Sequence, residues 1–530
     1  MSATVVGAGL GLVGSSAALL GQGGRLGQAG FGQDGTKVHV NAATGNLVVQ
    51  RQDDTLAGVG QTANLLRTYN SLGSWDGDNA DNWQLGLVQR VQLTGTVNTA
   101  GSTVLRTAAD GGTVSYSWNA TKAAYVANED GAEEDRITWN ATTSTWAWAD
   151  GATQAVQSYD SAGRLVQVAD RSGNKTSYTY TGSLLTQVKH LNNTAVAGST
   201  QNETITLVYD TAAGKTSNLR SVETRADNGL GTGSVLQTRV RYTYDASNRL
   251  ETVVTDLSPG DNVIADNNTF VTLYTYDGAS KRIASITQMA GGVYANATYR
   301  ANPYYFAGRL SITYDASGRV YQLKQLSSST VGFNITESTT TFVYGAGSTT
   351  VTDALGNATV VSFDAAKRLT RIAADGRNQD FAYVSATDSH LASATDALGR
   401  VTAYSYDAAG NRTLARDGAG NTVKYVYNAA NQLVATTRYT VADPDGGGAL
   451  LPSGGQTTRN VYDSANRLVY SLDAEGRVTR YERNALGQVT AELRYGKDRY
   501  SLATFTETTA PTQAQMDAWA AMPDKSQALR

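Results

Sequence analysis

The sequence predicts an all-β fold of stacked antiparallel β-hairpins, and three observations lead to it. A phrase of the form Tyr-Asp-x-x-Gly/Asn recurs along the chain, a second phrase Asp-x-x-Gly lies between its copies, and segments of strand length separate the two. The composition agrees, with 54 Gly, 6 Pro, 29 Tyr and 8 Phe in 530 residues. Glycine therefore makes the turns, and tyrosine suits strands with one hydrogen-bonding edge.

The first phrase is a tyrosine–aspartate turn. Its clear copies begin at Tyr159-Asp160, Tyr244-Asp245, Tyr314-Asp315, Tyr406-Asp407 and Tyr462-Asp463, and weaker copies begin at Tyr209, Tyr276, Phe363, Tyr427 and Tyr481. The second phrase begins at Asp170, Asp353, Asp396, Asp417 and Asp473.

Both phrases share the form D-x-x-G, which is typical of a type I turn. The aspartate accepts hydrogen bonds from backbone amides that follow it, and the fourth residue enters the left-handed region that Gly tolerates best and Asn next best. Lys367 departs from this rule, so we expect a weaker turn there. The fourth residues that obey it include Gly163, Gly318, Gly410, Asn248, Asn431 and Asn466.

Between the turns, pairs of the form Tyr-x-Tyr place two rings on one face of a strand. They occur at 178/180, 242/244, 274/276, 404/406 and 425/427. Tyr406 and Tyr427 lie 21 residues apart, which gives a unit of strand, turn, strand, turn. We expect the tyrosines to form ladders across strands. We also expect Arg164, Arg249, Arg319 and Arg467 to pair with aspartates on neighbouring hairpins, at about 0–1 kcal/mol for each exposed pair.

The pattern YDxxGRLxxVxDxxGxxxxYxY resembles the RHS/YD-repeat family of bacterial polymorphic toxins, toxin-complex subunits and teneurins. The match covers roughly residues 156–500, and Leu66 to Ser71 resembles the segment that opens such arrays. The resemblance implies a β-sheet ribbon that spirals into a hollow shell. Shells of this family end in a segment rich in D-P-x-G that precedes a variable toxin and supports self-cleavage, and this sequence has no match to that segment.

We divide the chain into four parts. Residues 1–30 are expected to form a flexible or helical Gly/Ala-rich tail, 31–155 a β region that opens the array, and 156–500 the repeats, with insertions near 190–205, 255–270, 289–308 and 440–457. Residues 501–530 are expected to form a helical connector, because Pro511 suits a first helical position and Met516, Trp519, Ala520 and Met522 follow at helical spacing. We expect the chain to be a fragment or a truncated member.

Composition excludes several classes of protein. A net charge of −3 and a pI near 5.8 leave no basic stripe for nucleic acid. The chain has no cysteine, which removes disulfides, thiol nucleophiles and Cys-type zinc sites. No segment predicts a membrane span, and the first charge is Arg25, so a secretory signal with a basic n-region is not recognisable.

Three candidate sites are weighed against plainer interpretations. Gly9, Gly11 and Gly14 match G-x-G-x-x-G, but a βαβ unit does not follow, so a glycine-rich tail is favoured over a nucleotide site. The histidines are His39, His190 and His390, and Asp388-Ser389-His390 is interpreted as a loop rather than a hydrolase triad. Asp76, Asp78 and Asp81 are weak calcium candidates, with a capped surface turn preferred.

The leading functional hypothesis is a non-enzymatic shell, without a cofactor, of an exported bacterial protein that encloses or presents a C-terminal effector polypeptide. It implies partnership with an effector and export machinery, and a secreted or cell-surface location. The second hypothesis is a glycan-binding adhesin that uses exposed Trp75, Trp83, Trp146 and Trp148. A repeat-fold enzyme is the third and requires an active site on the insertions.

Overall fold

The computed structural model describes residues 3–17, 28–56, 62–127, 135–151, 153–191, 203–227, 234–260, 263–264, 268–295, 297–300, 306–328, 335–446, 450–484 and 487–522. Within these residues the regular structure is almost entirely β-strand, arranged in two sheets. The all-β expectation is confirmed.

The first sheet, called the inner sheet below, has the strand order β1-β3-β4-β5-β6, with β2 added beside β3. The strand pairs of this sheet are antiparallel, except for the pair β1/β3, which is parallel. The strands are β1 (Ala3–Val5), β2 (Gly30–Phe31), β3 (Thr36–Asn41), β4 (Leu47–Leu56), β5 (Ala63–Asn70) and β6 (Trp83–Leu85).

The second sheet runs from β7 to β38, and each strand pairs antiparallel with the next along the chain until the sheet closes on itself. Its first eight strands form a small barrel, because Val91 N donates to Gly163 O (2.8 Å) and Leu165 N donates to Gln89 O (3.2 Å). They are β7 (Arg90–Thr94), β8 (Thr103–Thr107), β9 (Thr113–Asn119), β10 (Ala124–Ala127), β11 (Arg136–Asn140), β12 (Thr145–Ala149), β13 (Val156–Tyr159) and β14 (Leu165–Ala169).

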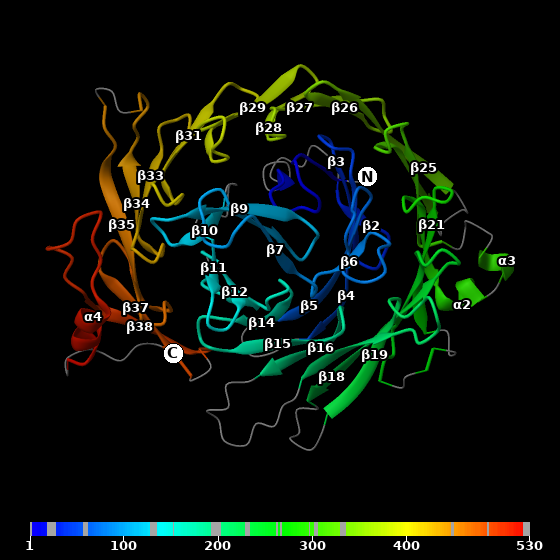
Figure 1. Ribbon diagram of the computed structural model, residues 1–530. Coiled ribbons are helices and arrows are strands. Elements are labelled where there is room, and N and C mark those ends of the chain that lie inside the picture. The colour runs from blue at the N-terminus through cyan, green and yellow to red at the C-terminus, as the bar shows by residue number, and fades with distance from the viewer. Residues whose placement is uncertain are drawn as a thin grey trace.

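The remaining strands form an outer ring that curves around the small barrel and the inner sheet (Figure 1). Its two ends meet where Arg171 Nη1 donates to Asn466 O (2.8 Å). Its first half comprises β15 (Lys175–Thr181), β16 (Leu184–Leu191), β17 (Thr204–Tyr209), β18 (Leu219–Asp227), β19 (Ser234–Tyr244), β20 (Leu250–Asp256), β21 (Thr269–Tyr276), β22 (Ile283–Ala290), β23 (Gly308–Tyr314), β24 (Val320–Ser328), β25 (Ile335–Gly345) and β26 (Ser348–Thr352). Its second half comprises β27 (Ala358–Phe363), β28 (Leu369–Ala374), β29 (Arg377–Tyr383), β30 (Leu391–Thr395), β31 (Val401–Tyr406), β32 (Arg412–Arg416), β33 (Thr422–Tyr427), β34 (Leu433–Val441), β35 (Ser453–Tyr462), β36 (Leu468–Leu472), β37 (Arg477–Arg483) and β38 (Val489–Arg499).

Strand direction sorts the connections onto two rims of the ring. Because successive strands are antiparallel, every turn that follows an odd-numbered strand from β13 onward lies on one rim, and the tyrosine–aspartate turns are all on this rim. Every connection that follows an even-numbered strand lies on the other rim. The four insertions expected from the sequence all fall on this second rim, after β16, β20, β22 and β34.

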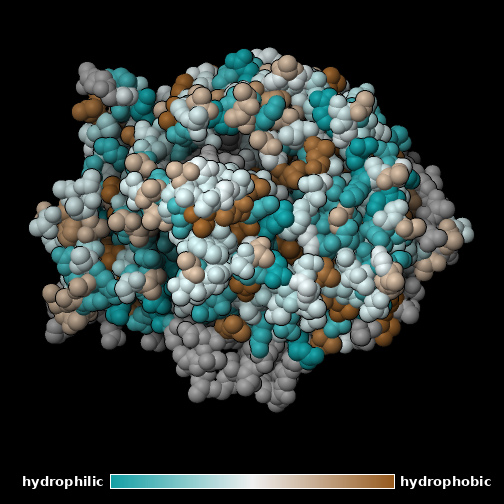
Figure 2. Space-filling model, viewed as in Figure 1, coloured by the Kyte–Doolittle hydropathy of each residue, from teal (hydrophilic) through white to brown (hydrophobic). Residues whose placement is uncertain are grey.

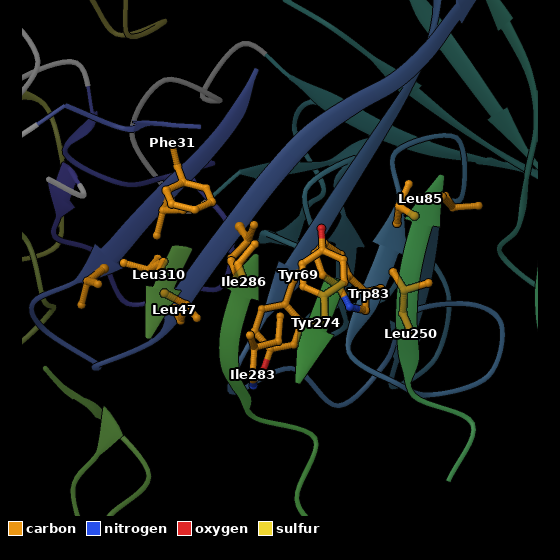
Figure 3. Close-up of a cluster of buried hydrophobic side chains, with 14 of the residues drawn as sticks. Phe31, Leu47, Tyr69, Trp83, Leu85, Leu250, Tyr274, Ile283, Ile286 and Leu310 are labelled. Carbon is orange, nitrogen blue, oxygen red and sulfur yellow. Dashed lines mark hydrogen bonds between the residues drawn. The ribbon is translucent and has the colours of Figure 1, made fainter. Parts of the chain in front are cut away.

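The inner sheet packs against the inside of the ring from β16 to β28 and shares one apolar core with it. Figure 3 shows Tyr69 and Trp83 of the inner sheet beside Tyr274, Ile283 and Ile286 of the ring. The Tyr69 hydroxyl also donates to Lys281 O at 2.8 Å. Burial of about 25 cal/mol per Å² of apolar surface makes this contact the main force that holds the two sheets together.

A buried ion pair fixes the inner sheet in one position against the ring. Arg67 Nε and Nη2 donate to the Asp53 carboxylate at 2.6 and 3.1 Å, and Tyr242 of β19 donates to the same carboxylate at 2.8 Å. Burial opposes ionisation of Asp53, but Arg67 and Arg51 hold its pKa below the usual value. Loss of one partner would leave a buried charge unpaired, so the pair specifies the register of the inner sheet.

Three helices lie among the described residues. α2 (Gly291–Ala295) and α3 (Ala297–Arg300) follow β22, and Val293 of α2 packs on Val271 and Met289 of the ring. α4 (Gln513–Ala520) packs Met516 and Trp519 against a cluster that includes Tyr470 and Tyr495. Among the described residues we find no helix whose length and apolar character would suit a membrane span.

The structure corrects two expectations about the ends of the chain. Residues 3–17 were expected in a flexible or helical tail, but β1 pairs with β3, and Val5 and Val6 are buried. At the other end, Pro511 precedes the helix: Thr512 is the N-cap, and its side chain accepts a hydrogen bond from Gln515 N. The helix covers β35 to β38, strands that precede it in the sequence. The face in Figure 2 shows apolar side chains in small groups among polar ones.

Candidate functional site: the repeat clamps and the inner wall of the ring

Each D-x-x-G turn is closed by its own aspartate. In the turn that starts at Asp315, Oδ1 accepts hydrogen bonds from Ser317 N and Arg319 N, both at 2.9 Å. The fourth residue is left-handed, with φ of 77° at Gly318. The same sign of φ occurs at Gly163, Gly410, Asn248, Asn431, Asn466 and also Lys367. The predicted turn geometry is therefore present, and Lys367 adopts it as well.

The fifth residue of each turn carries a donor that sequence reasoning missed. Arg249 Nε donates to Asp245 Oδ2 at 2.7 Å, and Asn421 Nδ2 donates to Asp417 Oδ2 at 2.8 Å. The signal was visible as Arg, Asn or Gln four positions after most turn-opening residues, the exceptions being Gly214 after Asp210 and Lys281 after Asp277. Arginines that pair this way within their own turn are Arg164, Arg249, Arg319, Arg368, Arg400, Arg467 and Arg477. The expected pairing with aspartates of neighbouring hairpins is wrong.

These arginines nevertheless reach the next hairpin through its tyrosine. The guanidinium carbons of Arg319 and Arg368 lie 4.3 Å from the ring centroids of Tyr344 and Tyr383, respectively. The same arrangement joins Arg164 to Tyr180 (4.9 Å) and Arg249 to Tyr276 (4.5 Å). The expected tyrosine ladder is thus an alternation of tyrosine and arginine, in which each cation lies over an aromatic face.

The tyrosine hydroxyl makes a further contact, which reaches back to the preceding hairpin. We call the turn aspartate, the arginine over the tyrosine ring and this hydroxyl bond together a clamp. Tyr344 donates to Val320 O at 2.6 Å, and Tyr314 donates to Ile283 O at 2.8 Å. The acceptor carbonyl belongs to the first residue of the strand after the previous turn, or to the second residue for Tyr209, which donates to Leu185 O. Burial raises the pKa of Tyr344, so the hydroxyl stays a donor. The same bond occurs at Tyr209, Tyr276, Tyr383, Tyr406, Tyr427 and Tyr462, over 2.6–3.3 Å.

The inner wall of the ring changes character along its length. Side chains directly opposite on neighbouring strands share a face, so the inner wall can be followed strand by strand. Opposite the inner sheet it is apolar and buried, with pairs such as Val240–Val222 and Val361–Ile372. These residues belong to the core shared with the inner sheet.

Beyond Phe381 the same wall is polar or small and half exposed. The cross-strand pairs that carry it onward are Phe381–Ala394, Ala394–Thr402, Tyr404–Ala415, Ala415–Val423, Tyr425–Thr436, Thr436–Thr458, Asn460–Ser471 and Ser471–Thr479. Each of these residues is only partly buried, except Thr458, which is exposed. We call this stretch, from β29 to β37, the polar wall.

Part of the polar wall faces a cavity of about 730 Å³. The β9–β10 hairpin of the small barrel contributes Lys122, Val126 and Ala127, and the ring contributes residues of β30 and β31 with their turns. Tyr404 and His390 are among the ring residues that line it. An open cavity therefore lies against the ring on this side, whereas the inner sheet fills the other side.

Comparison with known proteins agrees with the repeat geometry. The family profile described as RHS Repeat matches residues 159–194, 387–422 and 452–499. The chain carries RHS repeats. A search of curated proteins finds no match.

Solved structures were compared as well. The crystal structures titled TcdB2-TccC3, TcdB2-TccC3-TEV and TcdB2-TccC3-Cdc42 are 12%, 11% and 11% identical, with TM-scores of 0.33, 0.34 and 0.29. The alignments cover 79%, 85% and 86% of this chain but 26%, 30% and 27% of those chains. The chain thus spans less than a third of the length of these structures.

The acidic loop before the RHS repeats brings three carboxyl groups together. Ligand oxygens of Asp76, Asp78 and Asp81 all lie within 4.8 Å of one another. Burial and the charge of Asp76 raise the pKa of Asp81 to about 7, and burial with Asp81 and Asp76 raises that of Asp78 well above the usual value. The preferred interpretation was a capped surface turn. The capping is present, since Asp76 accepts from Ala80 N (3.0 Å) and Asn82 N (2.9 Å), but Asp76 and Asp81 are buried.

The glycine-rich segment that follows β1 has its amides committed to side chains of the chain itself. Leu12 N and Val13 N donate to Asp110 Oδ2 at 2.6 and 3.0 Å, and Gly11 N donates to Asn70 Oδ1 at 2.7 Å. A phosphate at this loop would compete with the Asp110 carboxylate for the same donors. The nucleotide interpretation therefore gains no support.

The histidines occupy structural positions. His390 Nδ1 lies 2.7 Å from Asp388 Oδ1, which also accepts from His390 N, so the pair caps the turn before β30. His190 contacts Thr176 Oγ1 and Leu56 O. Burial, and then Lys37, lowers the pKa of His39 to about 4. The structure does not bring the three histidines together as one site.

Of the four tryptophans proposed for sugar stacking, three are buried and one, Trp75, is partly buried. Trp83, Trp146 and Trp148 are 4%, 5% and 7% exposed, and Trp75 packs beneath Arg90, 3.9 Å from guanidinium carbon to ring centroid. The expectation that these rings are exposed is wrong. Trp146 and Trp148 instead belong to the core of the small barrel.

Proposed function

We propose that this chain is a structural shell segment of an exported bacterial RHS-repeat protein and that it encloses an effector polypeptide. The proposed role is non-enzymatic. Among the described residues, the recurrent aspartates, arginines and tyrosines form the clamps. The recurrence of these residues supports a structural role, because each copy makes the same contacts in its own turn.

One observation carries the proposal: the polar wall. A β-sheet face that is packed permanently is apolar, as the same ring shows from β16 to β28. From β29 to β37 the inner face is polar and half exposed, so water or a polar guest meets it. The glycan-binding alternative was motivated by exposed tryptophans, but Trp83, Trp146 and Trp148 are buried.

Cryo-electron microscopy of the purified chain tests the enclosed space. We expect a curved sheet with low density between the small barrel and strands β29–β37. Density filled by packed protein in that region would overturn the shell.

A fusion tests enclosure directly. An unfolded reporter segment with protease sites, placed after Arg530, is expected to resist proteolysis while the shell is folded and to be cut after denaturation. The same segment fused to an unrelated folded protein is the control. Equal cleavage rates in the two fusions would contradict enclosure, and recovery of the chain only inside the producing bacterium would contradict export.

A further inference from the structure

The charged groups of the polar wall are cationic. Side chains alternate along β29, so Arg377 and Gln379 share the inner face with Phe381. Arg438 shares the inner face of β34 with Thr436, which is paired with Tyr425. Both Arg377 and Arg438 are exposed. Lys122 adds a further cation to the cavity from the small barrel.

The strands of this part of the wall place no carboxylate on its inner face. Strands β29 to β34 contain one acidic residue, Asp380, and it lies opposite Thr395 and pairs with Arg371 on the outer face. Turn aspartates do border the surface, but each is engaged within its own turn: Asp388 by His390, Asp396 by Arg400, Asp407 by Asn411 and Asp417 by Asn421. The inner face of strands β29 to β34 therefore carries cations and no acidic side chain, and the carboxylates that border it are held by donors of their own turns.

Tyrosine rings hold one of the cations in place. The guanidinium carbon of Arg412 lies 5.6 Å from the ring centroid of Tyr404 and 5.2 Å from that of Tyr425. Both rings lie on the polar wall. An arginine fixed over aromatic faces keeps its fork of donors oriented and less hydrated, which suits it to a carboxylate. Thr402, Thr436 and Thr458 place hydroxyls along the same line.

We propose that the polar wall binds an extended acidic segment of polypeptide, with carboxylates on Arg412 and Arg438 and backbone amides on the threonine and tyrosine hydroxyls. This rests on the proposed function, because it names the kind of chain that the shell would hold. Each contact is weak on a half-exposed surface, so binding is a sum of many contacts and is reversible. The net charge of −3 disfavours nucleic acid as the occupant.

Binding to the full chain tests the proposal. A fluorescent poly-L-glutamate peptide is expected to show rising anisotropy with the chain, whereas poly-L-lysine of equal length shows none, and added salt weakens the signal. The double variant Arg412→Gln/Arg438→Gln should weaken binding by about tenfold. The matched control is Arg371→Gln, an exposed arginine on the outer face of the adjoining strand, and should bind as the parent does. Equal loss in the control, no poly-L-glutamate binding, or tighter binding of single-stranded DNA would overturn the proposal.

The absence of cysteine allows the bound position to be mapped. Thr436→Cys places one thiol on the polar wall, and Lys424→Cys places one on the outer face of the adjacent strand β33. Poly-L-glutamate should slow modification of the first thiol and leave the second unchanged. Thermal unfolding of each variant checks that the fold persists. Protection of both thiols or of neither would contradict binding at the wall. A lumen seen by electron microscopy would then still support the proposed shell.

Discussion

The guanidinium carbon of Arg249 lies 4.5 Å from the ring centroid of Tyr276, while its Nε donates to Asp245 in its own turn at 2.7 Å. Its Nη1 also donates to Gly278 O and Ser280 O, both at 2.7 Å, in the turn that follows Tyr276. One side chain thus joins two consecutive turns of the tyrosine–aspartate rim. Because the geometry repeats, the rim is a chain of such links.

Replacing Arg249 by lysine should break the link, because an ammonium cannot serve the carboxylate, the ring and two carbonyls at once. We expect a loss of about 1–2 kcal/mol in the free energy of unfolding, measured by urea denaturation. Arg400→Lys is the matched control, since Arg400 pairs with Asp396 in the same way but is 67% exposed against 15% for Arg249. The control should lose no more than about 0.5 kcal/mol. Equal losses would show that the link to the next hairpin contributes nothing.

The tyrosine hydroxyls are expected to matter only where they find an acceptor. Tyr344→Phe removes the donor to Val320 O and should cost about 1–2 kcal/mol, because that carbonyl is buried with Val320. Tyr180 is the internal control: its hydroxyl oxygen is buried without a hydrogen-bond partner. Tyr180→Phe should be neutral within about 0.5 kcal/mol or slightly stabilising. Calorimetric midpoints of the two variants measure the difference, and equal shifts would exclude the hydroxyl bond as the cause.

The local parts of this fold could be predicted because they are encoded within five residues. An aspartate that caps amides two and four positions on, and a fourth residue that tolerates positive φ, suffice to specify the turn at Asp315 or at Asp463. The strands between the turns follow from length and alternation. The donor at the fifth position was equally local and was missed, because its side chain was assigned to a neighbour instead of to its own turn.

The parts that could not be predicted depend on residues far apart in the sequence. Val320 N donates to Gly45 O at 3.0 Å, and Thr349 Oγ1 donates to Ala42 O at 2.6 Å; each bond joins the inner sheet to the ring. No periodicity near residue 45 indicates which strands will cover it. The polar wall shares this origin: Thr436 and Val253 are both strand residues, and only the position of the inner sheet decides which of them is buried.

Closure of the small barrel should depend on one glycine. A Cβ at Gly163, where φ is 81°, would lie 2.0 Å from Val91 O, the carbonyl of the strand that closes the barrel. Gly399 occupies the same turn position with φ of 77°, and no heavy atom lies within 4 Å of its Cβ position. Both alanine variants carry the left-handed strain, so Gly163→Ala should be less stable than Gly399→Ala by about 1–3 kcal/mol from the clash alone. Urea denaturation followed by tryptophan fluorescence reports the barrel core, and similar midpoints would contradict this role for Gly163.

The acidic loop should make stability depend on pH in a definite direction. Burial, with neighbouring carboxylates, raises the pKa of Asp81 to about 7 and that of Asp78 well above its usual value, so the folded state holds these protons more tightly than the unfolded chain does. That contribution is complete below the ordinary value of 3.8 and is lost as pH rises through about 7. By contrast, hydrogen bonds from Arg249 outweigh burial and lower the pKa of Asp245, so its contribution is lost only in stronger acid. Asp78→Asn should flatten the fall in urea midpoint between about pH 4 and pH 7. An unchanged slope would refute the assignment of this pH dependence to the acidic loop. If the urea midpoint of the parent protein near pH 7 rises with calcium but not with magnesium, a cation rather than a proton balances the three carboxylates.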